Sequence, residues 1–415
     1  MRQNVRLTAV VALLLLAPAP ARADAVQDWT GIMLTTIGGQ SPFAQARVAA
    51  ITELAVFEAV NACTGDYEPY LGTLNAPVGA SPEAAAIAAA HGVLRNYFPA
   101  SAATLDGARA QSLAAIPSDQ HTTDGITVGE AAAAAMIAAR ANDGSSPAQT
   151  FLPATTDPGV WQPTPPAFGP GILRQWGNVT PFGVQSTDQF RPGPPPALAS
   201  QKYRRDYDEV KAVGEVNSSA RPQDRSDVAR FFAAVPPTQV FNQAALQVSA
   251  AQGRGLTENA RAFALVNMAI SDGLFSVFEA KYFYVAWRPV TAIRAGDSDG
   301  NRRTEPDPAW TPFITTPSFP GYPSAHASGS GAARAVAERL FGANGHASTL
   351  SNPAIPSITL QYTNFRDITD DIDDARVYGG IHFRFDQEAG AVQGRRVGRY
   401  VYGHYLRPVH GNHDQ

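Results

Sequence analysis

Cysteine is almost absent from this chain, since Cys63 is the only one in 415 residues. A single cysteine excludes an intramolecular disulfide and any metal site that needs several thiolates. Cys63 lies in a stretch rich in alanine and valine, which favours a small buried residue over a reactive nucleophile. The fold must therefore be stabilised by packing.

Clusters of basic charge are missing as well, because no more than two lysines or arginines occur in succession and the net charge is −4. A nucleic acid or an anionic membrane surface is therefore not an expected partner. Beyond the leader, no uncharged apolar run reaches the roughly 20 residues that a membrane-spanning helix needs. We expect small-molecule partners and no transmembrane segment in the mature chain, while the oligomeric state stays open.

The first 25 residues have the pattern of an export signal. Arg2 and Arg6 precede an apolar run over 7–17, and small residues at 21–23 or 23–25 form candidate cleavage sites. The apolar run is about half as long as a membrane-spanning helix. The pattern predicts an exported protein, either periplasmic or secreted.

Alternation of apolar and polar residues, the pattern of half-buried strands, gives no convincing run. Helical spacing, helix-favouring composition and cap-then-proline pairs recur instead. They mark 41–62, 81–98, 102–116, 126–142, 200–215, 222–234, 256–288, 325–342 and 373–405. We predict an all-α fold of two packed helical bundles.

Proline, glycine, threonine and aromatic residues dominate about 144–198, where continuous helix is not possible. The aromatic residues indicate an ordered wrapping segment, because disordered chains are poor in them. They either pin the segment to the helices or rim a pocket; they are Trp161, Phe168, Trp176, Phe182 and Phe190. The predicted regions are 1–25 (signal), 26–198 (helices with the wrapping segment) and 199–415 (C-terminal region).

Two cationic residues, Lys281 and Arg288, lie seven positions apart in Lys281-Tyr-Phe-Tyr-Val-Ala-Trp-Arg288-Pro289. This is two helical turns, so one helix would place both on the same face. Pro289 disfavours helical geometry at Arg288, which predicts that the helix ends there and that Arg288 turns inward. The alternative is a solvated pair on an amphipathic helix.

A second segment, 319–329, passes from a proline-rich turn into an alanine-rich helix. The first N–H groups of such a helix lack partners and can point at an anion. Ser324 adds a hydroxyl and His326 an imidazole at the same end. Alternatively, Ser324 only caps the helix and His326 packs nearby.

In a third segment, His382 and Asp386 are four residues apart, which predicts one shared helical face. The carboxylate could accept from one imidazole nitrogen and leave the other free as a nucleophile or ligand. The glycine pair 379–380 permits a close backbone approach, and Arg376 lies about two turns upstream. A purely structural His–Asp pair is the alternative. Together, the three segments supply two imidazoles, three cations and a helix start, which can surround one oxyanion.

Taken in order, the three segments resemble the motifs of a known enzyme superfamily. It unites vanadium-dependent haloperoxidases with type 2 phosphatidic acid phosphatases and bacterial acid phosphatases, with motifs K-x6-R-P, P-S-G-H and S-R-x5-H-x3-D. The chain carries them as Lys281-x6-Arg288-Pro289, Pro323-Ser324-Ala325-His326 and Ala375-Arg376-x5-His382-x3-Asp386. The resemblance is clearest over 265–405 and is closest to exported bacterial haloperoxidases. Because 265–405 lies within the C-terminal region, we predict that 199–415 is the catalytic region.

The resemblance implies a site for vanadate, or for phosphate, whose equatorial oxygens are bound by cationic side chains and by a helix start. These groups would be Lys281, Arg288, Arg376, the Ser324 hydroxyl and the Ala325 N–H. Lys281 would also polarise bound peroxide. Ala325 replaces the motif glycine, and its methyl could narrow the site or require a different φ. Ala375 replaces the motif serine and removes one hydroxyl.

The remaining roles fall to the histidines and to Asp386. His382 would be the vanadium ligand, or the nucleophile of a phosphatase, and Asp386 would orient it. His326 would be the general acid and base. An aromatic residue at Phe319 resembles the chloride-oxidising type of haloperoxidase.

Three functions follow from these residues. The first is a haloperoxidase that oxidises halide with hydrogen peroxide to hypohalous acid, with vanadate as a Lewis acid. The second is a metal-free acid phosphatase or phosphotransferase that forms a phosphohistidine. The third is a non-catalytic oxyanion binder, which would not need two imidazoles, one of them backed by a carboxylate.

Overall fold

The computed structural model describes residues 24–409 and confirms the all-α prediction. Residues 1–23 of the predicted signal lie outside the described residues, so export stays a prediction. The helices are α1 (Ala25–Ile37), α2 (Pro42–Thr64), α3 (Pro82–Tyr97), α4 (Ala102–Leu113), α5 (Gln120–Ala139), α6 (Gln201–Val213), α7 (Gln223–Ala234), α8 (Pro237–Gln252), α9 (Leu256–Tyr284), α10 (Pro289–Arg294), α11 (Ala325–Phe341), α12 (Phe365–Tyr378) and α13 (Arg384–His404). Short 3₁₀ turns are η1 (Pro99–Ser101) and η2 (Arg174–Asn178).

Sequence patterns miss α1, α8, the short α10 and one hairpin. α1 begins at the predicted cleavage region, and the prolines 236–237 at the start of α8 look like a break, although proline fits the first helical position. The strands β1 (Ser348–Ser351) and β2 (Thr359–Tyr362) pair antiparallel. Their four residues each are too few to show a clear alternation.

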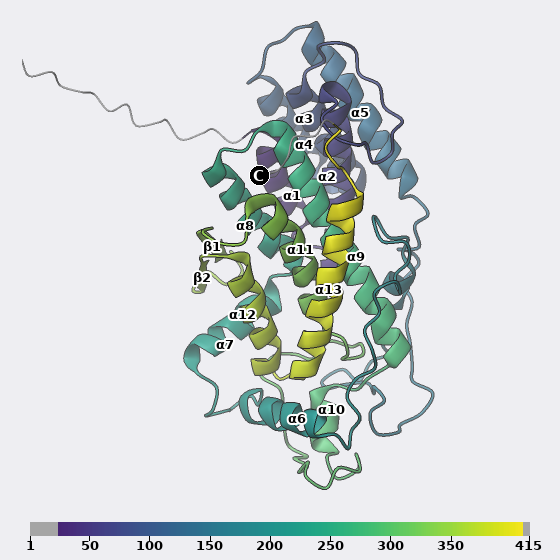
Figure 1. Cartoon of the computed structure of the whole chain (residues 1–415), viewed down its shortest axis with the longest axis vertical. Coiled ribbons are helices and arrows are strands. Elements are labelled where there is room, and N and C mark those ends of the chain that lie inside the picture. The colour runs from purple at the N-terminus through teal and green to yellow at the C-terminus, as the bar shows by residue number, and fades with distance from the viewer. Residues whose placement is uncertain (1–23, 410–415) are drawn as a thin grey trace, which may run out of the picture.

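Helix α9 connects the two halves of the fold, since it packs against α2 of the N-terminal half and against α11 and α13 of the C-terminal half (Figure 1). The buried apolar residues of these helices form one continuous core. Among residues 24–409, α9 alone is long and apolar enough to cross a membrane, but 94% of its most apolar stretch is buried inside the protein. Because the core packs helices from both sides of residue 198, the division there stays a prediction.

A second, aromatic core lies where α6 meets the start of α13. It is formed by large buried rings that include Tyr203, Tyr207, Trp287, Phe383 and Phe385. Trp287 directly precedes Arg288, and Phe383 directly follows His382. This core therefore supports the backbone that carries the predicted site.

The wrapping segment, 144–198, contains no α-helix and is pinned to the helices, as predicted. Trp176 stacks on Phe275 of α9 with ring centroids 5.7 Å apart. The buried carboxylate of Asp272, also on α9, accepts three successive N–H groups of residues 182–184 at 2.7, 2.7 and 2.9 Å. Burial raises the pKa of Asp272 to about 6 while these amides lower it, so the group is ionised at neutral pH.

Replacing Asp272 with Asn should lower the free energy of unfolding by about 2–3 kcal/mol, because an amide cannot satisfy three N–H donors as a carboxylate does. Urea denaturation measures this change. Asp188→Asn is the control, since its side chain in the same segment is 54% exposed. Equal stability of the two variants would show that Asp272 does not anchor the segment.

Candidate active site

Lys281 lies in the last turn of α9, and Arg288 lies beyond the end of that helix. α9 ends at Tyr284, where Val285 adopts a positive φ of 48°. Backbone hydrogen bonds then tie 285–287 to the wrapping segment. The prediction of one helix as far as Arg288 is therefore wrong. Both cationic side chains are nevertheless 0% exposed, which excludes a solvated pair.

Backbone carbonyls hold both cations in place. Lys281 Nζ donates to the carbonyls of residues 320–321 at 2.9 and 2.6 Å. Arg288 donates from Nε to the Phe319 carbonyl and from Nη1 to the Ile381 carbonyl, both at 2.9 Å. The two cations lie 5.5 and 5.0 Å from the centroid of the Phe319 ring. Phe319 thus lies beside them, and its effect on halide preference stays a prediction.

Ser324 is the N-cap of α11, which agrees with the capping interpretation. Its Oγ accepts from Ala327 N at 3.4 Å, and its own N–H donates to the carbonyl of Asp386 at 2.9 Å. The hydroxyl hydrogen stays available to a ligand, so capping and ligand binding are compatible. The start of α11 is therefore held directly against α13.

Ala325 is the first residue of α11 and has no positive φ. Its methyl therefore needs no unusual backbone conformation, although a glycine occupies this place in the motif. The next residue, His326, is partly exposed, as is Phe319, whereas Ser324 is 0% exposed. The side of the site that carries His326 and Phe319 is the side nearest to solvent.

A sharp turn at the glycine pair 379–380 separates α12 from α13. Gly380 has a φ of 77°, and a Cβ there would lie 2.2 Å from the carbonyl oxygen of Gly214, so only glycine fits. His382 follows the turn and precedes α13, whereas Asp386 is the third residue of α13. The prediction that both lie on one helical face is wrong, because the glycine pair ends the first helix.

The two side chains meet nonetheless, and their contacts fix the tautomer of His382. Nδ1 lies 2.8 Å from Asp386 Oδ2, which also accepts the Phe383 N–H at 3.1 Å. Nε2 lies 2.9 Å from Arg288 Nη1. Since a guanidinium can only donate, Nε2 carries the lone pair and Nδ1 the proton. A ligand that displaces the arginine contact meets an unprotonated nitrogen.

Arg376, in the last turn of α12, brings the third cation. Its Nη1 donates to the Phe232 carbonyl at 3.1 Å, near the end of α7. The same carbonyl accepts a hydrogen bond from the His326 ring. The sequence does not predict this contribution of α7, because every residue type has a backbone carbonyl.

The electrostatics of the site favour an anion. Burial lowers the pKa of Arg288 to about 9 and that of Arg376 to about 10, so both are cations at neutral pH. Burial and the neighbouring cations lower the pKa values of Lys281, His326 and His382 well below their usual range. An anion bound among these groups would relieve their mutual repulsion.

Two buried donors of the site, Arg288 Nη2 and Arg376 Nε, also lack a hydrogen-bond partner among the described residues. A vanadate or phosphate ion has several acceptor oxygens that suit such donors. Among residues 24–409, no cluster of three or more His, Cys, Asp or Glu side chains could hold a bare metal ion. The donor set therefore fits an oxyanion. We call it the oxyanion cradle; it comprises Lys281, Arg288, Ser324, Ala325, His326, Arg376 and His382.

Comparisons with known proteins agree with this fold. Residues 261–411 match the family described as the VCPO second helical-bundle domain. A vanadium chloroperoxidase of Curvularia inaequalis is 34% identical over 112 residues, which cover 24% of this chain and only 17% of that protein.

The solved structures match over almost the whole chain. A bacterial vanadium-dependent iodoperoxidase has a TM-score of 0.76 at 24% identity, and the match covers 93% of this chain and 97% of that one. A holo-type bacterial vanadium-dependent chloroperoxidase has a TM-score of 0.69 at 17% identity, with 94% of each chain covered. At these identities, the likeness shows a shared fold. The three ordered motifs and the match over residues 261–411 make the C-terminal region similar to the superfamily of vanadium-dependent haloperoxidases, type 2 phosphatidic acid phosphatases and bacterial acid phosphatases.

Proposed function

We propose that this protein is a vanadate-dependent haloperoxidase that oxidises halide with hydrogen peroxide to hypohalous acid. The observation that carries the proposal is the contact of His382 Nε2 with the buried cation Arg288, in a cradle that holds three basic side chains. Such a cradle offers one nitrogen ligand and compensating charge for a vanadate ion. The similar proteins named above are vanadium haloperoxidases, which supports this choice over a phosphatase.

The chain's own groups would share the work of binding. Lys281, Arg288 and Arg376 would neutralise the oxygens of the anion, with the Ser324 hydroxyl and the Ala325 N–H as further donors. Because these groups are almost fully buried, water would compete weakly for the anion. Bound vanadate would supply Lewis-acid activation of hydrogen peroxide without a change of oxidation state.

Proton handling would fall to the two histidines. Asp386 keeps the proton of His382 on Nδ1, so that Nε2 stays free for the ligand. His326, on the side nearest to solvent, is neutral at neutral pH because its pKa is lowered, and it can accept a proton from peroxide. Phe319, on the same side, would contact the incoming halide.

A metal-free phosphatase or phosphotransferase is the second candidate, because the same lone pair on His382 Nε2 could attack phosphorus. His326 would then protonate the leaving oxygen. Both chemistries need an oxyanion held beside one imidazole, so the same cradle would serve either. A binder without catalysis would not need the buried His382–Asp386 pair.

An activity comparison on the purified protein without vanadate tests the proposal. Orthovanadate should restore peroxide-dependent oxidation of bromide or chloride, while phosphate esters should be hydrolysed slowly or not at all. Vanadate-inhibited ester hydrolysis without halide oxidation would instead identify a phosphatase. Inactivity in both assays, with oxyanion binding retained, would leave a binding protein.

The cradle should bind sulfate more tightly as the pH falls between about 8 and 5. Sulfate stays a dianion in this range, so only protein groups titrate. Burial and the neighbouring cations lower the pKa of His326, and a bound dianion would compensate the cations and raise that pKa, so binding takes up a proton. Calorimetry at several pH values should show this slope, and His326→Gln should flatten it. An affinity for sulfate that does not change with pH would contradict the assigned electrostatics.

A further inference from the structure

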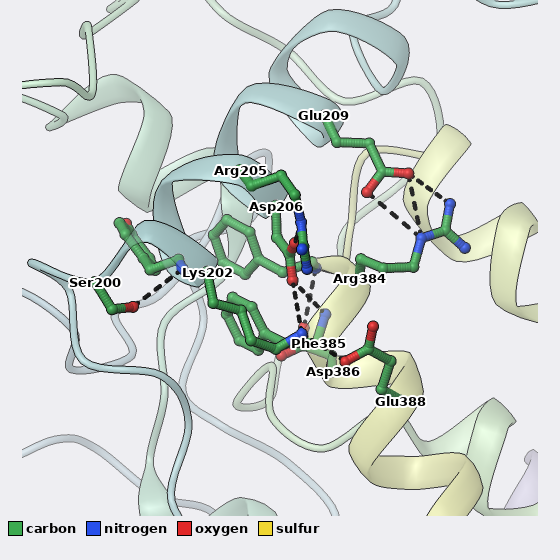
Figure 2. A network of polar contacts seen from close by, with 11 residues as sticks. Ser200, Lys202, Arg205, Asp206, Glu209, Arg384, Phe385, Asp386 and Glu388 are labelled. Atoms are coloured by element: carbon green, nitrogen blue, oxygen red, sulfur yellow. Dashed lines mark hydrogen bonds and ion pairs between the residues drawn. The ribbon is translucent and has the colours of Figure 1, made fainter.

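Asp206 lies on α6, outside the three motifs, and contacts the first turn of α13. Its side chain is 0% exposed, and Oδ2 accepts the N–H of Phe385 at 3.0 Å (Figure 2). Phe385 is the second residue of α13, so this N–H has no partner within its own helix. The N-cap residue Phe383 has no side-chain oxygen to accept it. Asp206 therefore caps α13 from a neighbouring helix.

The turn that Asp206 holds is also the turn that orients the cradle imidazole. Asp386, next to Phe385, accepts from His382 Nδ1 at 2.8 Å, and its carbonyl accepts the Ser324 N–H at 2.9 Å. A rotation of this turn would change both contacts together. The position of the turn therefore affects the nitrogen that His382 presents and the start of α11.

Helix α6 contacts this turn through one face, because the residues involved are four and three positions apart. The contacts are Lys202 with Glu388 at 2.5 Å, Asp206 with the Phe385 N–H at 3.0 Å, and Glu209 with Arg384 at 2.6 Å (Figure 2). The Lys202–Glu388 and Glu209–Arg384 contacts are partly exposed ion pairs, which contribute little to holding the turn in place. The buried central contact therefore contributes most to positioning.

The charge of Asp206 is compensated locally. Arg205 Nε lies 3.0 Å from its Oδ1, and Lys202 Nζ lies 3.6 Å from its Oδ2. A buried carboxylate with these partners can stay ionised and interact favourably with the positive end of the α13 dipole. Stability alone does not require this arrangement, because a neutral cap at the N-terminus of α13 would serve equally.

We propose that Asp206 is a positioning residue for the His382–Asp386 pair and that it sets the affinity of the cradle for oxyanions through the first turn of α13. Its effect on affinity rests on the proposed function, whereas its effect on the His382 ring does not. The two effects can therefore be measured separately.

The test uses the full chain with ¹⁵N-labelled histidine and two readouts. The first is the rate at which the His382 Nδ1–H exchanges with water, with the signal assigned by its loss in His382→Gln. The second is the dissociation constant for orthovanadate. In Asp206→Ala we expect the exchange rate and the dissociation constant each to rise about tenfold or more. Loss of a residue that orients a ligating histidine typically has an effect of this size.

Matched variants separate positioning from general destabilisation. Asp206→Asn keeps an acceptor and should stay within about threefold of wild type. Asp208→Ala removes a carboxylate that is 46% exposed on the same helix, and Asp272→Asn destabilises a distant contact; both should leave the His382 signal unchanged. If Asp206→Ala does not fold, Asp206→Leu replaces it, because it removes the acceptor but fills the space.

An unchanged His382 exchange rate in Asp206→Ala or Asp206→Leu would overturn the proposal. The same holds if Asp272→Asn changes that rate equally. If wild type binds neither orthovanadate nor sulfate, the proposed function is wrong, and the exchange rate alone still decides whether Asp206 positions the pair.

Discussion

His382→Ala should reduce vanadate-restored halide oxidation by about 10³-fold or more, the largest effect we expect from one substitution. The variant loses the nitrogen that would bind the anion, and it leaves Asp386 buried without the imidazole donor. Arg288 Nη1 also loses its contact with Nε2, so the cation can shift. Initial rates at saturating orthovanadate measure the effect.

The control for this variant is His404→Ala. His404 is the exposed last residue of α13 and contacts the backbone carbonyl and the ring of Tyr400 on its own helix, so its removal should leave the rate unchanged. Far-ultraviolet circular dichroism should show that both variants keep their helices. A His382→Ala protein that retains more than about a tenth of the activity would exclude His382 as the ligand.

Gly394→Ala should lower the free energy of unfolding by about 3 kcal/mol, the largest effect on stability that we predict. Helices α11 and α13 pack with their backbones close together, and a Cβ on Gly394 would lie 2.0 Å from the carbonyl oxygen of Ser328. Backbone cannot move aside as a flexible side chain can, so the two helices must separate. The starts of these helices carry Ser324 and Asp386, so activity should fall as well.

Replacing Gly403 with Ala should instead raise the free energy of unfolding. Gly403 lies on α13 too, but a Cβ there would meet nothing within 4 Å. Alanine is the better helix former by about 1 kcal/mol, so Gly403→Ala should stabilise slightly. Urea denaturation of both variants compares them directly. Similar changes at the two positions would contradict the close packing of α11 and α13.

The sequence predicts the residues of the cradle better than the backbone that presents them. Residue types and spacing identify Lys281, Arg288, Arg376 and His382, and the structure brings these side chains together around Arg288. Local geometry was less predictable. A glycine pair inside a helical pattern does not say whether the helix continues, and the contact of Gly380 with Gly214 decides this through tertiary packing.

Other parts of the site leave no signal in a single sequence. The carbonyls of Phe319, Ile381 and Phe232 hold two of the cations, and any residue type supplies such a carbonyl. The role of Asp206 is equally hard to predict from the sequence, because this residue lies in a charged amphipathic helix where an aspartate normally faces solvent. Only the packing of α6 against α13 shows that this carboxylate is buried.

The most direct test of the central claim is a crystal soaked in orthovanadate, with diffraction measured where vanadium scatters anomalously. We predict one strong anomalous peak in the cradle, beside His382 Nε2 and within contact of Arg288 and Ser324. The peak should disappear in His382→Ala. A vanadium peak elsewhere on the protein, or none at a concentration that restores activity, would contradict the assignment of the site.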